Sequence, residues 1–249
     1  MSKSGILGRA CVVAGLLASS FELSAQTRAA SAASYIERGN DFHHQGNLDR
    51  AIADYTMAIQ FDPNSALAYF NRGSAHQERG DFAKAMADYN KAIEIDPQHA
   101  DAYSNRGNVY KENGDTEQAL SDYAAALNIN PKLPKVYYNR GNLRFLEGDL
   151  DSALADFDTA IQLDRKYVKA YNNRGITRQE KGDLTGAIAD FGNAVKIAPD
   201  HAEAYANRGL ALLLQGKNGE AERDFSRSLI LKPDLKSFIE QRRAQIVRR

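Results

Sequence analysis

The feature that most constrains the fold is an Asn-Arg-Gly triplet that recurs every 34 residues. It occurs at 71–73, 105–107, 139–141, 173–175 and 207–209, and Glu-Arg-Gly takes its place at 37–39. A fixed period of this length is typical of chains that repeat one supersecondary unit instead of building a single globular core. The period predicts six tandem units between residues 32 and 236, with approximate bounds 32–65, 66–99, 100–133, 134–167, 168–201 and 202–236.

Small and aromatic residues recur at fixed places around each triplet. In the third unit they are Tyr103, Gly107, Gly114, Ala119 and Tyr123. The second glycine of a unit is mostly followed by Asn or Asp, which predicts a helix end and then the N-cap of the next helix. Each unit should therefore be two antiparallel helices. Because a single pair cannot bury its own apolar face, we expect the units to stack.

These residues closely resemble the tetratricopeptide repeat family, which has the same aromatic, Gly, Ala, aromatic, Ala and Pro residues at this spacing. The resemblance covers about 205 of the 249 residues. It implies an all-α fold, a right-handed superhelical solenoid of antiparallel helix pairs. Residues 237–249 are predicted to form a capping helix with a basic tail, and Leu235, Phe238, Ile239 and Ile246 are expected on its buried face. Contact of the tail with anionic lipid is the alternative.

The arginine of each triplet has an aspartate sixteen residues later, and the turn glycine lies midway between them. Residues equidistant from the turn stand at the same height on the two helices of a hairpin, so each arginine should meet its own aspartate. The six predicted structural ion pairs are Arg38/Asp54, Arg72/Asp88, Arg106/Asp122, Arg140/Asp156, Arg174/Asp190 and Arg208/Asp224.

The asparagine of the triplet lies about 100° away from the arginine on a helix. The family resemblance implies that this side of the first helix lines the concave wall of the solenoid. A row of amides both donates and accepts hydrogen bonds, which suits the backbone of an extended peptide. The arrangement is similar to the asparagine ladder of O-linked N-acetylglucosamine transferases, and the simpler interpretation is that the asparagines only solvate or cap the helices. The candidate groove residues are Asn71, Asn105, Asn139, Asn173, Asn207, Asn40, Asn108, Asn142, Phe70, Tyr138, Lys135 and Lys169.

The first 25 residues differ from the repeats. Lys3 and Arg9 precede a short apolar run at 10–18, and small residues lead to Ala25. This pattern predicts a secretory signal peptide at 1–25, followed by a short linker at 26–31. Cleavage after Ser20 and an uncleaved N-terminal anchor are the alternatives. Cys11 is the only cysteine, so a processed chain would have no disulfide and no thiol chemistry.

Charge and chemistry exclude several classes of function. Lysine plus arginine (32) equals aspartate plus glutamate (32), whereas nucleic-acid binding usually needs a basic excess. His43 and His44 are adjacent and point in different directions, and His99 and His201 lie between units. We therefore expect no metal, no cofactor and no catalytic site.

The sequence favours an exported, non-enzymatic adaptor or scaffold that binds a protein or an extended peptide in the concave groove. In a bacterium its location would be the periplasm or cell envelope. Two alternatives stay open. The chain could self-assemble through the ends of the solenoid, or it could be an accessory subunit of an envelope enzyme or secretion complex.

Overall fold

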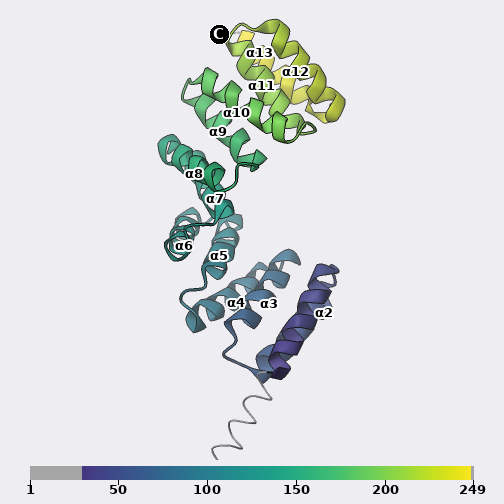
Figure 1. Ribbon diagram of the computed structural model, residues 1–249, viewed down its shortest axis with the longest axis vertical. Helices are drawn as coiled ribbons and strands as arrows, with labels where there is room; N and C mark the ends of the chain where they lie inside the picture. The colour runs from purple at the N-terminus through teal and green to yellow at the C-terminus, as the bar shows by residue number, and fades with distance from the viewer. Residues whose placement is uncertain (1–29, 248–249) are drawn as a thin grey trace, which may run out of the picture. The chain divides into compact units, whose positions relative to one another are not determined.

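The computed structural model describes residues 30–247. The predicted signal peptide and the last two residues of the tail lie outside the described residues. Within them every element is helical and no strand occurs, which confirms the predicted all-α class (Figure 1). The helices are residues 30–44, α2 (Leu48–Phe61), α3 (Ala66–Glu78), α4 (Phe82–Ile95), α5 (Ala100–Glu112), α6 (Thr116–Ile129), α7 (Pro134–Leu146), α8 (Leu150–Leu163), α9 (Val168–Glu180), α10 (Leu184–Ile197), α11 (Ala202–Leu214), α12 (Asn218–Leu231), the 3₁₀ turn η1 (Pro233–Leu235) and α13 (Lys236–Val247). None of the helices in this range is both long enough and apolar enough to cross a membrane.

The turns inside the helix pairs depend on glycine. The second glycine of each unit has a φ between +74° and +86°, a conformation that other residues adopt only with strain. Asn47, Asp149 and Asp183 then cap the following helix, as their side chains accept a backbone N–H from its first turn. Asp81 makes no such cap, because its carboxylate instead accepts hydrogen bonds from Arg79.

The chain forms two compact parts, which we call the N-terminal part (through Gln118) and the C-terminal part (from Ala119). In the N-terminal part α3 packs against α2, α4 and α5, and α4 also contacts α5. In the C-terminal part α7 to α12 pack each on the next, and α7 contacts α9 as α9 contacts α11. The first helices of successive pairs therefore touch within each part and share a continuous surface, which we call the first-helix face.

Small residues allow the two helices of a pair to approach closely. At Gly175 an added Cβ would lie 2.7 Å from Cε1 of Phe191, because the phenyl ring packs directly on the glycine. Ala187, on the same second helix, is fully buried. The same contact brings Gly209 and Phe225 together. The aromatic ring fills the space that the missing side chain leaves, so neither residue can change size without moving a helix.

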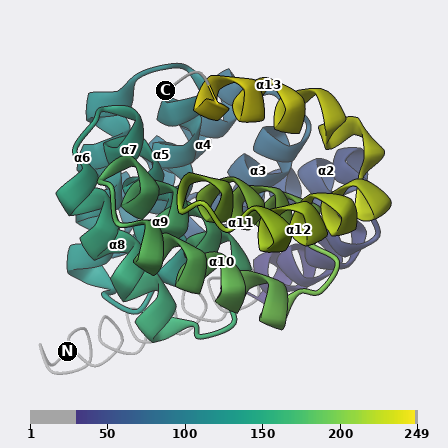
Figure 2. The ribbon, with the colours of Figure 1, turned by 90° about the horizontal axis from the view of Figure 1, so that it is seen from above.

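The last helix covers the apolar end of the C-terminal part. α13 contacts α11, and Ile239 is 2% exposed among Leu210, Leu212 and Phe225. Figure 2 shows α13 following α12 at the end of the chain. Phe238 differs from its predicted place on the buried face, since it is 42% exposed. The buried stripe runs through Leu235, Ile239 and Ile246, and a residue next to Ile239 points about 100° away from it.

Candidate functional site

Five of the triplet arginines each bind the aspartate sixteen residues later through two hydrogen bonds. In Arg174–Asp190 the Nε–Oδ2 distance is 2.9 Å and the Nη2–Oδ1 distance is 2.5 Å. Equivalent pairs at 2.6–2.9 Å are Arg38–Asp54, Arg72–Asp88, Arg140–Asp156 and Arg208–Asp224. The two residues of the sixth predicted pair belong to different parts of the chain: Arg106, which is half-buried, to the N-terminal part, and Asp122, which is buried, to the C-terminal part. The hydrogen bonds with their aspartates raise the pKa of Arg72 and of Arg208.

Each triplet arginine also lies over the ring of the tyrosine three residues earlier. The distances from the guanidinium carbon to the ring centroid are 4.9–5.6 Å for Arg38, Arg72, Arg106, Arg140, Arg174 and Arg208. Cation–π contacts of this kind compensate part of the hydration that a buried guanidinium loses. The charge at the border of the core is therefore held by an aspartate and an aromatic ring together.

Two further kinds of contact made by these ion pairs were not predicted from the sequence. Arg144 and Arg178 follow their triplet arginines by four residues, and each donates to the same aspartate, at 2.8 Å. The sequence does carry a signal for this, because a cation at i+4 shares the helix face of the first. Arg174 also reaches Asp158 of the preceding helix pair, with 2.6 Å between Nη1 and Oδ1.

The asparagines of the row link successive first helices to each other. Asn71 donates through Nδ2 to the Oδ1 of Asn40, at 3.0 Å, and Asn173 donates in the same way to Asn142, at 2.7 Å. Both links join residues that are 31 positions apart. Asn105 makes the equivalent contact with the hydroxyl of Ser74, at 3.3 Å. The side-chain nitrogens of the row thus serve packing between repeats.

The hydrogen-bond partner of the asparagine changes where the accepting residue differs. Ile176 occupies the place of the accepting asparagine, and Asn207 donates instead to Asn172 at 3.0 Å. Tyrosine hydroxyls add further links, since Asn105 lies 3.4 Å from the Tyr89 hydroxyl and Asn173 lies 3.3 Å from that of Tyr138.

The carbonyl oxygens of the row are used differently from the nitrogens. Asn71, Asn105 and Asn207 are half-buried, and each donates through Nδ2 to a neighbouring side chain. Their Oδ1 atoms accept no hydrogen bond from the described residues, whereas Oδ1 of Asn173 accepts from Asn172 at 3.1 Å. Three amides are therefore fixed through nitrogen and retain a carbonyl acceptor.

The remaining predicted groove residues fall into three groups. Phe70 lies against the ring of His99 in a tilted arrangement, with centroids 4.7 Å apart, and the ring of Tyr138 lies 5.1 Å from that of Tyr167, so both rings pack between repeats. Lys135 and Lys169 are exposed on the first turns of α7 and α9. Asn108 and Asn139 are half-buried.

A cavity of about 410 Å³ opens on the first-helix face of the N-terminal part. It is lined by Ser74 and Asn105 of the network and by Gln77, Glu78, Phe82 and Glu112. Hydrogen bonds hold this wall, because the Tyr89 hydroxyl donates to the Oε1 of Gln77 at 2.7 Å. The row therefore borders a recess wide enough for part of a peptide.

The described residues offer no metal centre. No group of three His, Cys, Asp or Glu side chains within residues 30–247 is placed to hold an ion. His99 and His201 instead cap α5 and α11, as their Nδ1 atoms accept the N–H of Ala102 and Ala204 at 3.3 and 3.2 Å. These histidines thus have structural contacts.

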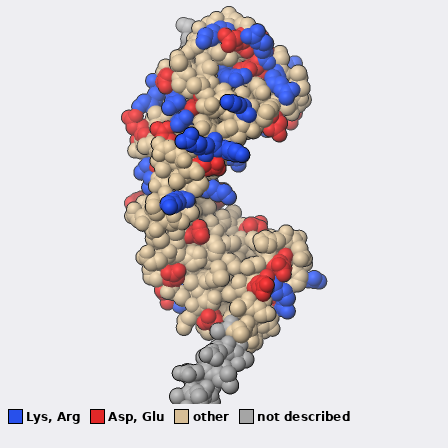
Figure 3. Space-filling model, viewed as in Figure 1, with Lys and Arg blue, Asp and Glu red and all other residues tan. Residues whose placement is uncertain are grey.

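The zero net charge of the chain conceals a difference between its two parts. Residues 30–118 hold 8 basic and 14 acidic residues, a net charge of −6. Residues 119–249 hold 21 basic and 17 acidic residues, a net charge of +4. Figure 3 shows lysine and arginine side chains over the visible face of the C-terminal part. The two parts therefore differ in the sign of their net charge.

Comparisons with known proteins agree on the fold. A family model described as a TPR repeat matches residues 39–80, 77–114, 107–146, 141–182 and 177–216. No curated protein matches the chain. Among solved structures, pilF from Pseudomonas aeruginosa has a TM-score of 0.75 and 19% identity over 83% of this chain and 94% of that one.

Two other solved structures are similar over most of their length. A tetratricopeptide repeat protein from Parabacteroides merdae has a TM-score of 0.65 and 24% identity, and the match covers 87% of this chain and 90% of that one. YrrB, whose structure is described as a TPR protein with an unusual peptide-binding site, has a TM-score of 0.63 and 24% identity over 72% of this chain and 93% of its own. At these identities the likeness concerns the fold.

Proposed function

Because this chain belongs to the tetratricopeptide repeat family, we propose that it is a non-enzymatic adaptor or scaffold that binds an extended protein segment along its first-helix face. Proteins of this family generally bind proteins or peptides. The proposal rests on the hydrogen bonds that the side-chain amides of the asparagine row make. Asn71, Asn105 and Asn207 are fixed through nitrogen and keep a half-buried carbonyl acceptor.

Fixed acceptors suit the N–H groups of an extended peptide. The amides of Asn71 and Asn105 are already ordered by their neighbours, so binding costs little further side-chain entropy. A peptide in extended conformation presents backbone N–H groups that need partners when water is displaced. Recognition of this kind depends on the backbone, and the recess lined by Gln77, Phe82 and Glu112 supplies contacts for side chains.

The proposed location is outside the cytoplasm, in the periplasm or cell envelope if the organism is bacterial. Only the sequence of residues 1–25 supports this part of the proposal. N-terminal sequencing of the chain recovered from an envelope fraction would test it. A recovered N-terminus at Gln26 supports export with cleavage after Ala25, and a chain that starts at Met1 in the cytoplasmic fraction contradicts it.

The alternative of stacking between copies has less support at the C-terminal end. α13 covers the apolar residues Leu210, Leu212 and Phe225, which an uncovered end would offer to a second copy. Light scattering of the full chain would decide this point, since an adaptor of the proposed kind should be monomeric at micromolar concentration.

Selection from a random peptide library displayed on phage tests the binding function. We expect peptides enriched on the full chain to lose about tenfold in affinity for an Asn71→Ala/Asn105→Ala variant, because two hydrogen bonds are removed. A matched control, Asn128→Ala/Asn193→Ala, changes two exposed asparagines of second helices and should bind as the wild type does.

Replacing Asn71 and Asn105 also removes hydrogen bonds between helices of the protein. A second measurement therefore changes the peptide instead. N-methylation of single backbone amides in an enriched peptide removes donors without altering the protein. The proposal expects affinity to fall at several spaced positions. If no position is sensitive to N-methylation, and the asparagine variant binds as well as the wild type, the row does not recognise peptide backbone.

A further inference from the structure

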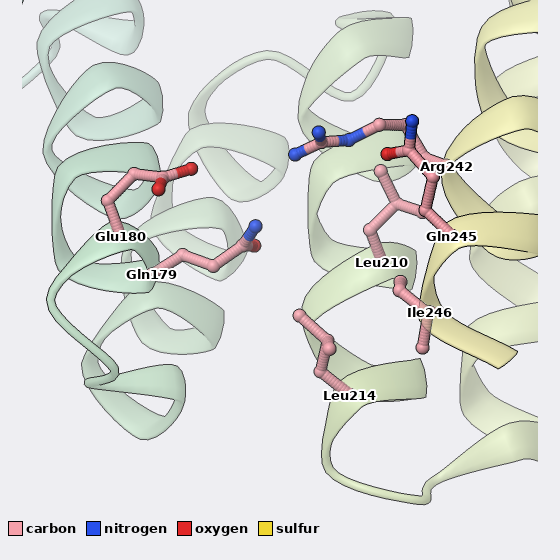
Figure 4. Close-up of a pocket in the computed structure, with 7 residues that line it drawn as sticks. All are labelled: Gln179, Glu180, Leu210, Leu214, Arg242, Gln245 and Ile246. Atoms are coloured by element: carbon pink, nitrogen blue, oxygen red, sulfur yellow. The ribbon is translucent and has the colours of Figure 1, made fainter. Parts of the chain in front are cut away.

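A second cavity, of about 260 Å³, lies between α9, α11 and α13 in the C-terminal part (Figure 4). Its floor is apolar, because Leu210 is buried and Leu214 and Ile246 are half-buried. In the two preceding helix pairs the residue at the place of Leu210 is Asn142 or Ile176. α11, the first helix of the last pair, therefore presents a more apolar surface at this place than the first helices of the two preceding pairs.

The wall that α13 contributes has one arginine held in place and one that is free to bind. Arg243 lies over the ring of Phe225, 5.0 Å from its centroid, and donates to Glu222. Ile239 anchors the same helix in the core. Arg242, the next residue, points about 100° away from Arg243 and lines the cavity. It forms no ion pair with any residue of the described range.

Opposite charges face each other across the mouth of this cavity. Figure 4 shows Glu180 and Gln179 projecting from α9 toward α13, and Arg242 extending from α13 toward α9. Glu180 has no ion-pair partner among residues 30–247, and it is exposed, as Arg242 is. Gln245 adds a second amide on the α13 side. The apolar floor therefore has a donor-rich wall on one side and a carboxylate on the other.

The size of the cavity fits one large side chain. An apolar cavity of about 150 Å³ is sufficient for a benzene ring, and this one is larger and open to solvent. Three aliphatic side chains form its floor, and four polar or charged side chains surround them. One apolar side chain can therefore sit on the floor while polar groups beside it meet the walls. The position beside the first-helix face places it where a peptide bound along the C-terminal part would pass.

We propose that this pocket takes one large apolar side chain of the bound peptide, and that the flanking peptide residues carry opposite charges. The acidic neighbour lies toward Arg242 and the basic neighbour lies toward Glu180. The inference rests on the proposed peptide-binding function and specifies the partner chemistry in the C-terminal part. In this proposal α13 has two roles, because it forms one wall of the binding site and also covers the core.

Titration of blocked pentapeptides into the ¹⁵N-labelled full chain tests the inference. The reference probe is acetylated and amidated Ala-Lys-Leu-Glu-Ala, and the others are Ala-Gln-Leu-Gln-Ala, Ala-Gln-Leu-Glu-Ala and Ala-Lys-Ala-Glu-Ala. We expect backbone signals of Leu210, Leu214 and Gln245 to shift with the leucine probes. Two exposed ion pairs contribute about threefold each, so the reference should bind roughly tenfold more tightly than the uncharged probe. Replacement of leucine by alanine should weaken binding at least tenfold, roughly the effect of burying one such side chain.

Protein variants identify the charges that matter. Arg242→Gln should weaken the probes with glutamate about threefold and leave the uncharged probe unchanged, while Glu180→Gln should affect only the probes with lysine. Arg223→Gln is the matched control, since it removes an exposed arginine of α12 that does not line the cavity. Thermal unfolding verifies that each variant is folded.

Three outcomes would overturn the inference. The leucine and alanine probes could bind equally, the shifts could map away from the cavity, or Arg242→Gln and Arg223→Gln could have equal effects, which would mean unspecific attraction to a basic surface. These outcomes are separate from failure of the proposed function. A library-selected peptide that depends on Asn71 and Asn105 but leaves the signals of Leu210 and Gln245 unshifted contradicts the pocket alone.

Discussion

Asp190 accepts hydrogen bonds from Nε and Nη2 of Arg174, at 2.9 and 2.5 Å, although sixteen residues and a turn separate the two residues. Only 1% of the Asp190 side chain is exposed. Arg178 donates to the same carboxylate at 2.8 Å. A buried carboxylate with two arginines is costly to form, but once it is formed, loss of one partner leaves a charge without compensation.

The first prediction concerns this ion pair. Asp190→Ala should lower the free energy of unfolding by about 3–5 kcal/mol, because two guanidinium groups then lack their acceptor. Arg174→Ala should lower the free energy of unfolding by less, since Arg178 still binds Asp190. The double variant should cost clearly less than the sum of the single variants, as measured by urea unfolding followed by circular dichroism. Strict additivity would contradict the coupling.

The second prediction separates two glycines of α10. Gly192 has open space at its Cβ position, and the nearest atom is Nη1 of Arg208 at 3.9 Å. Gly192→Ala should raise the free energy of unfolding by about 1 kcal/mol through helix propensity. Gly192→Asp should add a contact with Arg208, as Asp158 makes with Arg174, and this added stability should decrease with salt.

The control for this prediction lies six residues earlier. An added Cβ at Gly186 would come 2.1 Å from Oδ2 of Asp183, whose other oxygen caps the helix through the Gly186 N–H at 2.8 Å. Gly186→Ala must therefore displace the cap, and loss of a cap costs about 1 kcal/mol. The net change in the free energy of unfolding for Gly186→Ala should be near zero. Equal stabilisation by both alanine variants would show that the cap is unimportant.

The third prediction concerns the contact between glycine and an aromatic ring. At Gly175 an added Cβ would meet Cε1 of Phe191 at 2.7 Å. Gly175→Ala should cost about 1–3 kcal/mol, because the rigid ring moves only if the helices separate. Hydrogen exchange of the α9 and α10 amides would detect local loosening. A variant as stable as the wild type would mean that the ring can shift without cost.

The fourth prediction is a pH dependence. Burial lowers the pKa of His76 below its usual 6.5, and the nearby Arg79 and Arg72 act in the same direction while Asp88 opposes them. Below pH 6.5 the unfolded chain takes up a proton that the folded chain binds less tightly. The free energy of unfolding should therefore fall as pH drops through this region and stay level above it.

Thermal unfolding between pH 7.5 and 5.5 measures the effect. His76→Phe places at this position the residue that Phe42 supplies one unit earlier, and it should flatten the dependence. His44→Gln, at an exposed histidine, should leave the slope as in the wild type. An unchanged slope in His76→Phe would assign the pH dependence to other groups.

Much of the fold could be predicted because it depends on local chemistry that repeats. The turn glycines, the caps and the small residues opposite aromatic rings each carry a sequence signal, and the all-helical class is confirmed. Equal distance from the turn also accounts for the contact between Arg174 and Asp190. The function of the asparagine row stays a prediction, as does the division of residues 32–236 into six units.

The sequence alone determined which residues repeat and therefore which helices pair. Within one hairpin, the number of residues from the turn decides which residues of the two helices face each other. Only the tertiary structure decided how one pair meets the next. The link from Asn173 to Asn142, the different surroundings of Gly186 and Gly192, and the place of Arg242 in a pocket wall depend on how far each helix rotates and approaches its neighbour. Those quantities are set by packing of side chains from separate repeats, and no spacing within a single repeat encodes them.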